Sequence, residues 1–210
     1  MTDRKENQLL SDRITLLVLF KVLSELGLDT RRLKLEKLVY LVNVIGRVRG
    51  TAITGQEFFV WNLGPFSKQV YSDLESCVIH KWLNAKPLDE SNEIDERSFE
   101  YTITDQGIRA ADRAIESSEF RSKYELMHGI LQVIGPLSSN EIRRLSYGEL
   151  DFRKAKEQGK GTVIDPNFPE SLRMAKLAKE VAQRHFELSL SDEEAAFLYL
   201  KLVETQSPQR

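Results

Sequence analysis

Only one cysteine, Cys77, occurs in the 210 residues, so the chain cannot form a disulfide within itself. Disulfides are typical of oxidising compartments, and their absence fits the reducing cytoplasm. Cys77 lies on a predicted helix, where a lone cysteine usually serves as a small buried residue and not as a nucleophile. We therefore expect a cytoplasmic protein with Cys77 in its core.

The sequence also lacks a hydrophobic run that could cross a bilayer. The longest run, Ile14 to Leu23, is interrupted by Lys21 and falls well short of the roughly 20 apolar residues that a spanning helix needs. It has no signal-peptide cleavage pattern either. A buried amphipathic helix explains this segment, and we expect no membrane partner.

Strong net charge and clustered metal ligands are absent as well. The 30 basic and 32 acidic residues give a formal net charge of -2, so the overall balance does not indicate a polyanion as a partner. His80, His128 and His185 stand far apart, without a second ligand at metal-binding spacing. The segment GKGT at 159–162 resembles the end of a phosphate-binding loop, but the upstream glycine and strand are missing. No catalytic motif appears, so we predict no enzyme and no cofactor.

Helical periodicity dominates what is present. Apolar residues recur at steps of three and four along most of the chain, which predicts a mainly α single domain of the α+β class with a small antiparallel sheet. We expect a flexible N-terminus over 1–10, a helical domain over 11–187, and a C-terminal helix and tail over 188–210. Helices are predicted at about 11–26, 32–45, 65–82, 104–117, 120–134, 140–145, 169–186 and 191–204, with a charged loop over 147–162.

The N-terminal half has the element order of a winged helix. Three helices are followed by a hairpin near 86–103, whose second strand at 99–103 alternates large and polar residues. The turn of this hairpin, 89–97, is acidic. We therefore predict a winged-helix-like N-terminal half with an acidic wing.

A sharp corner is predicted at Gly64-Pro65. An extended, aromatic-rich run over 58–63 ends there and a helical pattern follows at once. Glycine adopts backbone angles that other residues avoid, and proline suits the first turn of a helix. We expect Gly64 to have a conformation that disfavours a side chain, and we assign Tyr40, Gly64 and Pro65 to fold determination.

Positive charge is concentrated between residues 31 and 49. Six basic residues stand there against one carboxylate, Glu36; they are Arg31, Arg32, Lys34, Lys37, Arg47 and Arg49. Such a stretch is either a solvated helix face or a surface for an anionic partner. We take Arg31, Arg32, Arg47 and Arg49 as candidate partner-binding residues that would steer a partner with an acidic face.

Aromatic residues cluster just after this stretch. Phe58 and Phe59 are neighbours on one extended segment, so they cannot both point into the core from a single-faced strand. One set of aromatics is therefore exposed or covered by later helices, and exposed aromatics are typical binding anchors. Core packing is the alternative for each of them. We take Trp61, Phe66 and Tyr71 as further partner-binding candidates.

DNA binding is considered because winged helices often read DNA with their third helix. In the predicted third helix Lys68 and Lys81 are balanced by Asp73 and Glu75, and the acidic wing at 89–96 would repel phosphates. The sequence therefore does not favour DNA as the partner.

The chain resembles the Panacea domain, also called the SocA-like antitoxin domain. The resemblance is carried by LEKLVYL at 35–41, by the spacing of Trp61, Gly64, Pro65 and Tyr71, and by segments at 141–147, 152–159 and 163–165. It covers roughly residues 10–185. Tyr147 and Phe152 depart from it, because the family often has His and Trp there. The longer hairpin and the phrase at 101–107 are similar to the YwgA-like winged-helix proteins.

The resemblance implies a non-enzymatic antitoxin that neutralises a toxin by direct protein–protein contact. A winged-helix DNA-binding regulator and an accessory subunit of a phage or defence assembly are the alternatives. The sequence carries no signal for an oligomeric state.

Overall fold

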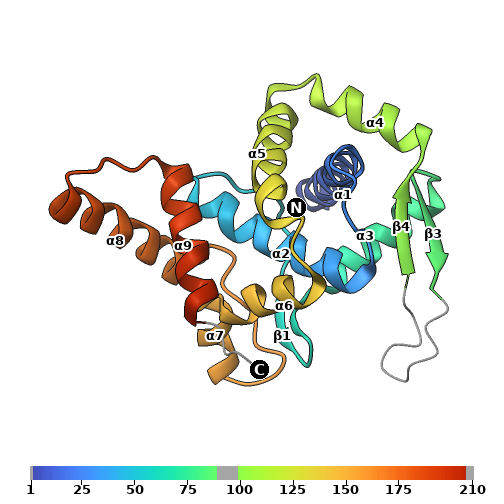
Figure 1. The fold of residues 1–210 in the computed structure, drawn as a ribbon. Coiled ribbons are helices and arrows are strands. Elements are labelled where there is room, and N and C mark those ends of the chain that lie inside the picture. The colour runs from blue at the N-terminus through green and yellow to red at the C-terminus, as the bar shows by residue number, and fades with distance from the viewer. Residues whose placement is uncertain (1, 89–98, 207–210) are drawn as a thin grey trace.

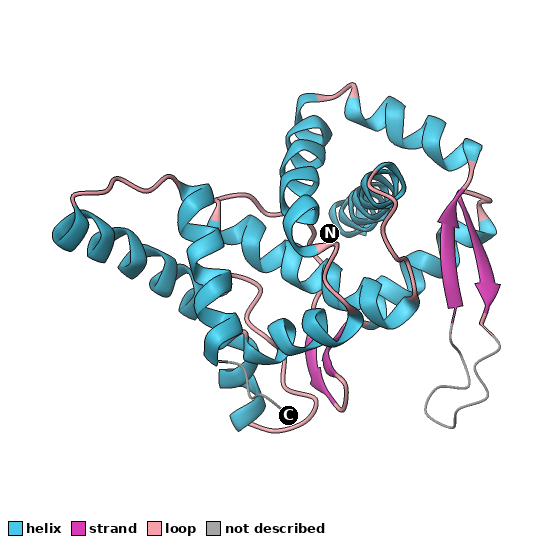
Figure 2. Ribbon diagram, in the orientation of Figure 1, coloured by secondary structure: helices cyan, strands magenta, loops and turns pink. Residues whose placement is uncertain are grey.

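A computed structural model describes residues 2–88 and 99–206 of the protein. These residues form one mainly helical domain with two small antiparallel two-stranded sheets (Figures 1 and 2). The predicted fold class is confirmed, although the single predicted sheet is in fact two. The described elements are α1 (Thr2–Glu25), α2 (Arg32–Val48), β1 (Phe59–Trp61), β2 (Gly64–Phe66), α3 (Lys68–Ile79), β3 (Leu83–Pro87), β4 (Phe99–Ile103), α4 (Asp105–Ile115), α5 (Ser118–Ile134), α6 (Ser139–Gly148), α7 (Leu150–Glu157), α8 (Pro169–Phe186) and α9 (Asp192–Gln206).

The N-terminal half has the winged-helix arrangement. The strands β3 and β4 pair antiparallel, with Leu83 opposite Ile103 and Ala85 opposite Tyr101. A β-bridge between Arg31 and Glu100 joins the connection between α1 and α2 to the outer edge of β4. The predicted acidic turn at 89–97 lies outside the described residues.

Helix α2 is the centre of the molecule. It contacts α5, α6, α8 and α9 and also the strands β2 and β4, so almost every side of it is covered (Figure 1). A helix that is apolar all round belongs in a core, and the run LVYLVNVI in α2 is of this kind. Its polar residues Lys34, Glu36, Lys37 and Asn43 are buried with it, and each of them therefore needs a partner.

The structure corrects three predicted element boundaries. Helix α1 begins at Thr2, so the segment expected to be a flexible N-terminus is helical. Helix α3 begins at Lys68 and not at Pro65. Ser67 caps it by accepting a hydrogen bond from the Val70 N–H, while Pro65 lies in β2 opposite Val60. The predicted loop at 147–162 contains α7.

Local signals at several other helix ends were predicted correctly. Helix α8 runs from Pro169 to Phe186, as its periodicity indicates. Ser138 and Glu141 form the predicted capping box at the start of α6. Ser191 and Glu194 exchange the same pair of hydrogen bonds at the start of α9. Such caps satisfy backbone N–H groups that have no partner within the helix.

Candidate functional site

Three aromatic side chains from three different elements stack in a row on the surface. The ring centroids of Trp61 and Phe66 are 5.8 Å apart, and those of Phe66 and Tyr71 are 5.3 Å apart. A cation ends the row on each side, because the Arg32 guanidinium lies 3.9 Å from the Tyr71 centroid and the Lys160 ammonium 4.0 Å from the Trp61 centroid. We call Trp61, Phe66 and Tyr71 the aromatic ladder. The structure thus brings together four of the predicted candidates: Arg32, Trp61, Phe66 and Tyr71.

The alternation of β1 explains why part of the ladder is exposed. Phe58 and Val60 point into the core, with 3% and 4% of their surface exposed, while Trp61 is 44% exposed. Successive side chains of a strand point to opposite faces. The prediction that these aromatics cannot all be buried is therefore confirmed, and Trp61 is on the outer side.

Gly64 allows the ladder to approach the second half of the chain. Its φ of +98° is in the region that disfavours side chains, as predicted. A Cβ atom placed on Gly64 would be 2.3 Å from Cε1 of Tyr147, which belongs to α6 and stacks on Phe152. This corner therefore needs glycine for its conformation and for the close approach of α6.

A buried ion pair holds the ladder's base to α2. The Lys37 ammonium donates to the Glu36 carboxylate at 2.7 Å and to the carbonyl of Pro65 at 2.6 Å, and Glu36 also accepts from the Ser67 N–H. Burial lowers the pKa of Lys37. A buried charge is tolerated only when it is paired, so these two residues fasten β2 in place and do not offer a free charge.

Two hollows flank the ladder. The smaller, of about 180 Å³, is lined by the ladder and by Arg32, Glu36 and Lys37. The larger, of about 500 Å³, lies between α3 and the β3–β4 hairpin, and Arg32 and Tyr71 line both. Ile79, at the end of α3, is 77% exposed beside the larger hollow. Burial and the Glu36 carboxylate raise the pKa of Tyr71, so this side chain is neutral at physiological pH.

The predicted basic surface at 31–49 is not one surface. Arg31 and Arg49 flank α2 at opposite ends, and this helix of 17 residues is about 25 Å long. Arg31 pairs with Asp29 and Arg49 with Glu193. Lys34 and Lys37 are buried. Only Arg32 of the predicted basic candidates therefore contributes to the ladder.

Arg47, the remaining basic candidate, lies in the last turn of α2, at the end away from Arg31, and it is half-buried. Tyr40, which was assigned to fold determination, is completely buried. It packs edge-on against Phe58 and Phe168. The two residues therefore lie away from the ladder, Arg47 at the far end of α2 and Tyr40 in the core.

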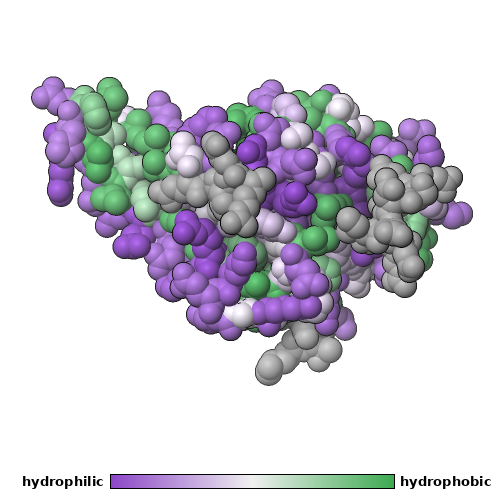
Figure 3. All heavy atoms as spheres, turned by 60° about the horizontal axis from the view of Figure 1, so that its bottom comes forward, coloured by the Kyte–Doolittle hydropathy of each residue, from purple (hydrophilic) through white to green (hydrophobic). Residues whose placement is uncertain are grey.

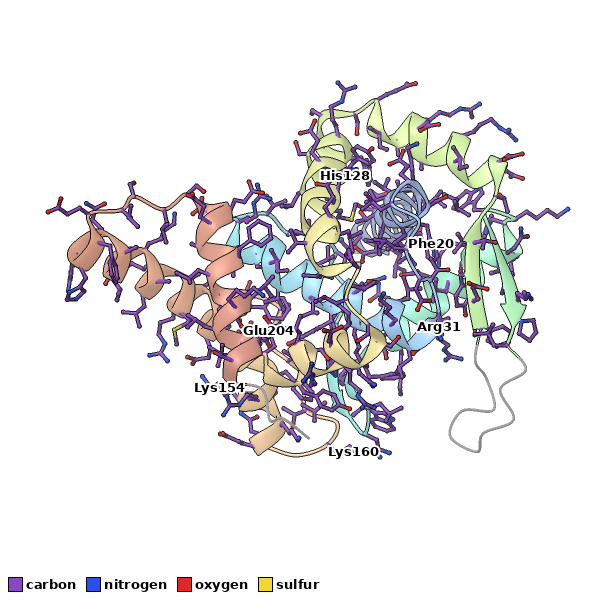
Figure 4. The ribbon with its side chains drawn as sticks, viewed as in Figure 1. Phe20, Arg31, His128, Lys154, Lys160 and Glu204 are labelled. Carbon is purple, nitrogen blue, oxygen red and sulfur yellow. The ribbon has the colours of Figure 1, made fainter. Side chains whose placement is uncertain are left out.

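Sequence reasoning missed a basic surface on α6, α7 and the following loop. Residues 143–160 carry one exposed carboxylate, Glu157, because Glu149 and Asp151 are buried. Against it stand six exposed basic side chains: Arg143, Arg144, Arg153, Lys154, Lys156 and Lys160. In the sequence alone, Glu149 and Asp151 offset part of this positive charge, so the excess becomes visible only once their burial is known. Figure 4 shows Lys160 beside the lower end of the β1–β2 hairpin and Lys154 on α7.

Another exposed surface is apolar and lies on α8. This helix packs small residues, Ala175, Ala178 and Ala182, toward the interior, while Leu177, Val181 and Phe186 on it are exposed. Figure 3 shows hydrophobic side chains gathered at the end of the molecule formed by α8, whereas hydrophilic residues cover much of the centre of that face. This surface is separate from the ladder.

Other sequence candidates have ordinary structural surroundings. Cys77 is completely buried, and burial raises the pKa of its thiol to about 12. Among residues 2–88 and 99–206, no three His, Cys, Asp or Glu side chains gather closely enough to hold a metal ion. Over the same residues, no helix has the length and apolar character needed to cross a membrane.

A comparison of the chain with models of known protein families found no match, and a comparison with curated proteins found none either.

Proposed function

We propose that the protein is a non-enzymatic binding module that holds a protein partner against the aromatic ladder and its two hollows. The observation that carries this proposal is the stack of Trp61, Phe66 and Tyr71 with Arg32, which is partly exposed and fixed in place before binding. Trp, Tyr and Arg are the residues that most often dominate binding energy at protein interfaces. Rigid side chains also lose little conformational entropy when a partner binds.

We propose further that this partner is a toxin, which the protein neutralises in the cytoplasm by direct contact. This part of the proposal rests on the resemblance to the Panacea domain. The ladder supports it in chemical terms only, as a surface suited to protein recognition.

Co-expression with a candidate toxin tests the proposal, and a small protein encoded next to this gene would be the first candidate. Expression of that protein alone should arrest growth, and co-expression of the wild-type chain should restore it. The double variant Trp61→Ala, Phe66→Ala should fail to restore growth while keeping a normal circular dichroism spectrum. Phe186→Ala is the matched control, because Phe186 is 67% exposed but lies on α8. Rescue by the double variant equal to that of wild type would refute the ladder as the binding surface.

A winged-helix DNA-binding regulator is the second candidate, because the arrangement of α1 to α3 with β3 and β4 is the one that such regulators use. The exposed side of α3 argues against it. Lys68, Ser72, Glu75 and Ile79 face solvent there, so this side is neutral overall and ends in an apolar residue. A groove-reading helix usually presents Arg, Lys, Asn or Gln to phosphates and base edges. An accessory role in a phage or defence assembly would use the same protein-binding surface.

A further inference from the structure

We propose that the segment of the partner that binds the aromatic ladder is an acidic peptide, and that its carboxylates bind Lys160, Lys156 and Arg143. This inference rests on the proposed function, since it specifies the chemistry of the partner at the same site. The sequence predicted that the partner is attracted by the basic stretch at 31–49. We place the attracting charge on the surface of α6 and α7 instead.

Two cations beside the ladder lie over aromatic rings. The Lys160 ammonium lies 4.0 Å from the centroid of Trp61, and the Lys156 ammonium lies 5.9 Å from that of Tyr147. Both lysines are exposed, and within the described residues neither pairs with a carboxylate. Arg143 is exposed one helical turn before Tyr147. The site therefore offers several positive charges that no acidic side chain of the described protein neutralises.

The local charge differs in sign from that of the whole chain. The chain as a whole has a formal charge of -2. Over residues 143–160, the burial of Glu149 and Asp151 leaves Glu157 as the one exposed carboxylate among six exposed basic side chains. Lys154, at the α8 side of α7, pairs with Glu170 at 2.7 Å, so it is not among the residues proposed to bind the carboxylates. Such a local excess of positive charge attracts anionic groups and speeds their association.

The stacking of the ladder favours an acidic peptide over a single-stranded nucleic acid. A base binds an aromatic side chain by lying on a free ring face. The Lys160 ammonium lies over the Trp61 ring and the Arg32 guanidinium over the Tyr71 ring, while Phe66 packs against both rings at interplanar angles of 30° and 35°. A base that stacked on Trp61 or Tyr71 from the side of its cation would have to displace that cation. Ring edges carry partial positive charge, so the exposed edges suit carboxylate and carbonyl oxygens. A peptide reaches these edges and the ammonium groups without displacing any ring.

Fluorescence anisotropy with labelled probes tests the inference. The probes are a short peptide of alternating glutamate and leucine, the same peptide with glutamine for glutamate, and an oligothymidylate of matched length. The glutamate peptide should bind most tightly, and its binding should weaken as salt is added. Equal binding of the two peptides, or tighter binding of the oligonucleotide that depends on the same lysines, would overturn the proposal.

Charge-reversal variants locate the binding. The pair Lys156→Glu, Lys160→Glu should weaken binding of the glutamate peptide about tenfold or more. The control pair Arg109→Glu, Arg113→Glu makes the same change in net charge on exposed positions of α4, at the opposite end of the molecule from β1 (Figure 1). It should change binding by less than about twofold, because screening weakens charges beyond a Debye length. An equal loss in both pairs would contradict the site.

A measurement without any partner checks the charge around Trp61. The chain has two tryptophans, so Trp82→Phe leaves Trp61 as the one fluorescent indole. Iodide should then quench the fluorescence more strongly than caesium, and Lys160→Glu should reverse this order. If the growth rescue depends on Trp61 but the glutamate peptide does not bind, the acidic partner is wrong while the proposed function stands. If rescue and peptide binding both fail to depend on Trp61, the proposed site is wrong.

Discussion

At the scale of single residues, Gly64 combines two requirements that can be measured separately. Its backbone is in a conformation that favours glycine, and the position of a Cβ atom is already occupied by Tyr147. Gly159 meets only the first requirement, because its φ is +106° and nothing lies within 4 Å of where its Cβ would be.

We predict that Gly64→Ala lowers the free energy of unfolding by about 2–4 kcal/mol, since strain and a steric clash add. Gly159→Ala should cost about 1 kcal/mol, since strain acts alone there. Urea denaturation of the two variants and the wild type gives both values. Equal losses would mean that the contact with Tyr147 does not restrict this corner.

At the scale of elements, two buried carboxylates attach α8 and α9 to the rest of the domain. Glu149, at the start of α7, accepts hydrogen bonds from the hydroxyls of Tyr40 on α2, Ser171 on α8 and Tyr199 on α9. Asp151 accepts from the backbone N–H groups of Glu170 and Ser171, each at 3.0 Å, and so caps α8 from another helix. Phe168, the residue at the N-cap position of α8, provides no side-chain cap itself.

Burial and the negative charge of Asp151 raise the pKa of Glu149 above the ordinary value of 4.5. At a pH between 4.5 and the raised pKa, Glu149 is protonated in the folded state but has lost its proton in the unfolded chain. The contribution of Glu149 to the free energy of unfolding is therefore fully present below pH 4.5 and is lost as the pH rises through the raised pKa.

We predict that the free energy of unfolding falls with rising pH in this window, by up to about 1.4 kcal/mol per pH unit. Glu149→Gln should remove that part of the slope. Below pH 4.5 the variant should also be less stable than wild type by about 1–3 kcal/mol, because an amide N–H₂ would then face a backbone N–H, and this difference should shrink as the pH rises. Burial also raises the pKa of Asp12, so Asp12 too makes stability fall as the pH rises. It does so in the variant and in the wild type alike, and the difference between their two profiles therefore reports on Glu149.

The control for this experiment comes from groups that titrate in the opposite sense. Hydrogen bonds from Ser138 lower the pKa of Glu141, and bonds from Ser191 lower that of Glu194. Stability from these caps is lost as pH falls below the ordinary carboxyl range, outside the window of Glu149. Parallel pH profiles for wild type and Glu149→Gln above 4.5 would refute the role assigned to Glu149.

At the scale of the whole molecule, a winged-helix arrangement is combined with a neutral third helix. Affinity for duplex DNA comes largely from basic side chains placed against phosphates. Over residues 143–160, six exposed basic side chains stand against one exposed carboxylate, and this local excess lies on α6, α7 and the following loop and not on the outward side of α3.

We predict weak binding to duplex DNA, in the micromolar range or weaker at physiological salt, with no preferred sequence. Anisotropy titrations with a random duplex, followed by selection from a random library, give the affinity and the specificity. Lys68→Ala should leave the affinity almost unchanged. A nanomolar site with a cost of about 1–3 kcal/mol per mismatched base pair would identify a DNA-binding regulator instead.

The amino-acid sequence by itself determined the features that depend on neighbouring residues. Pro169 begins α8, Ser138 and Glu141 cap α6, and Gly64 has a positive φ, because caps, prolines and glycines act on the backbone within a few residues. The alternation around Phe58 also predicted correctly that some aromatics face outward.

Only the tertiary structure decided which charges are buried and which rings meet. The carboxylates of Glu149 and Asp151 make 147–162 look like a solvated loop, yet they are core residues. The Tyr40 hydroxyl donates to Glu149 and the Ser171 backbone N–H donates to Asp151, and both donors are distant in sequence. The ladder joins side chains from β1, β2 and α3 and is completed by Lys160. Burial and stacking of this kind depend on contacts between distant segments, and local periodicity carries no information about them.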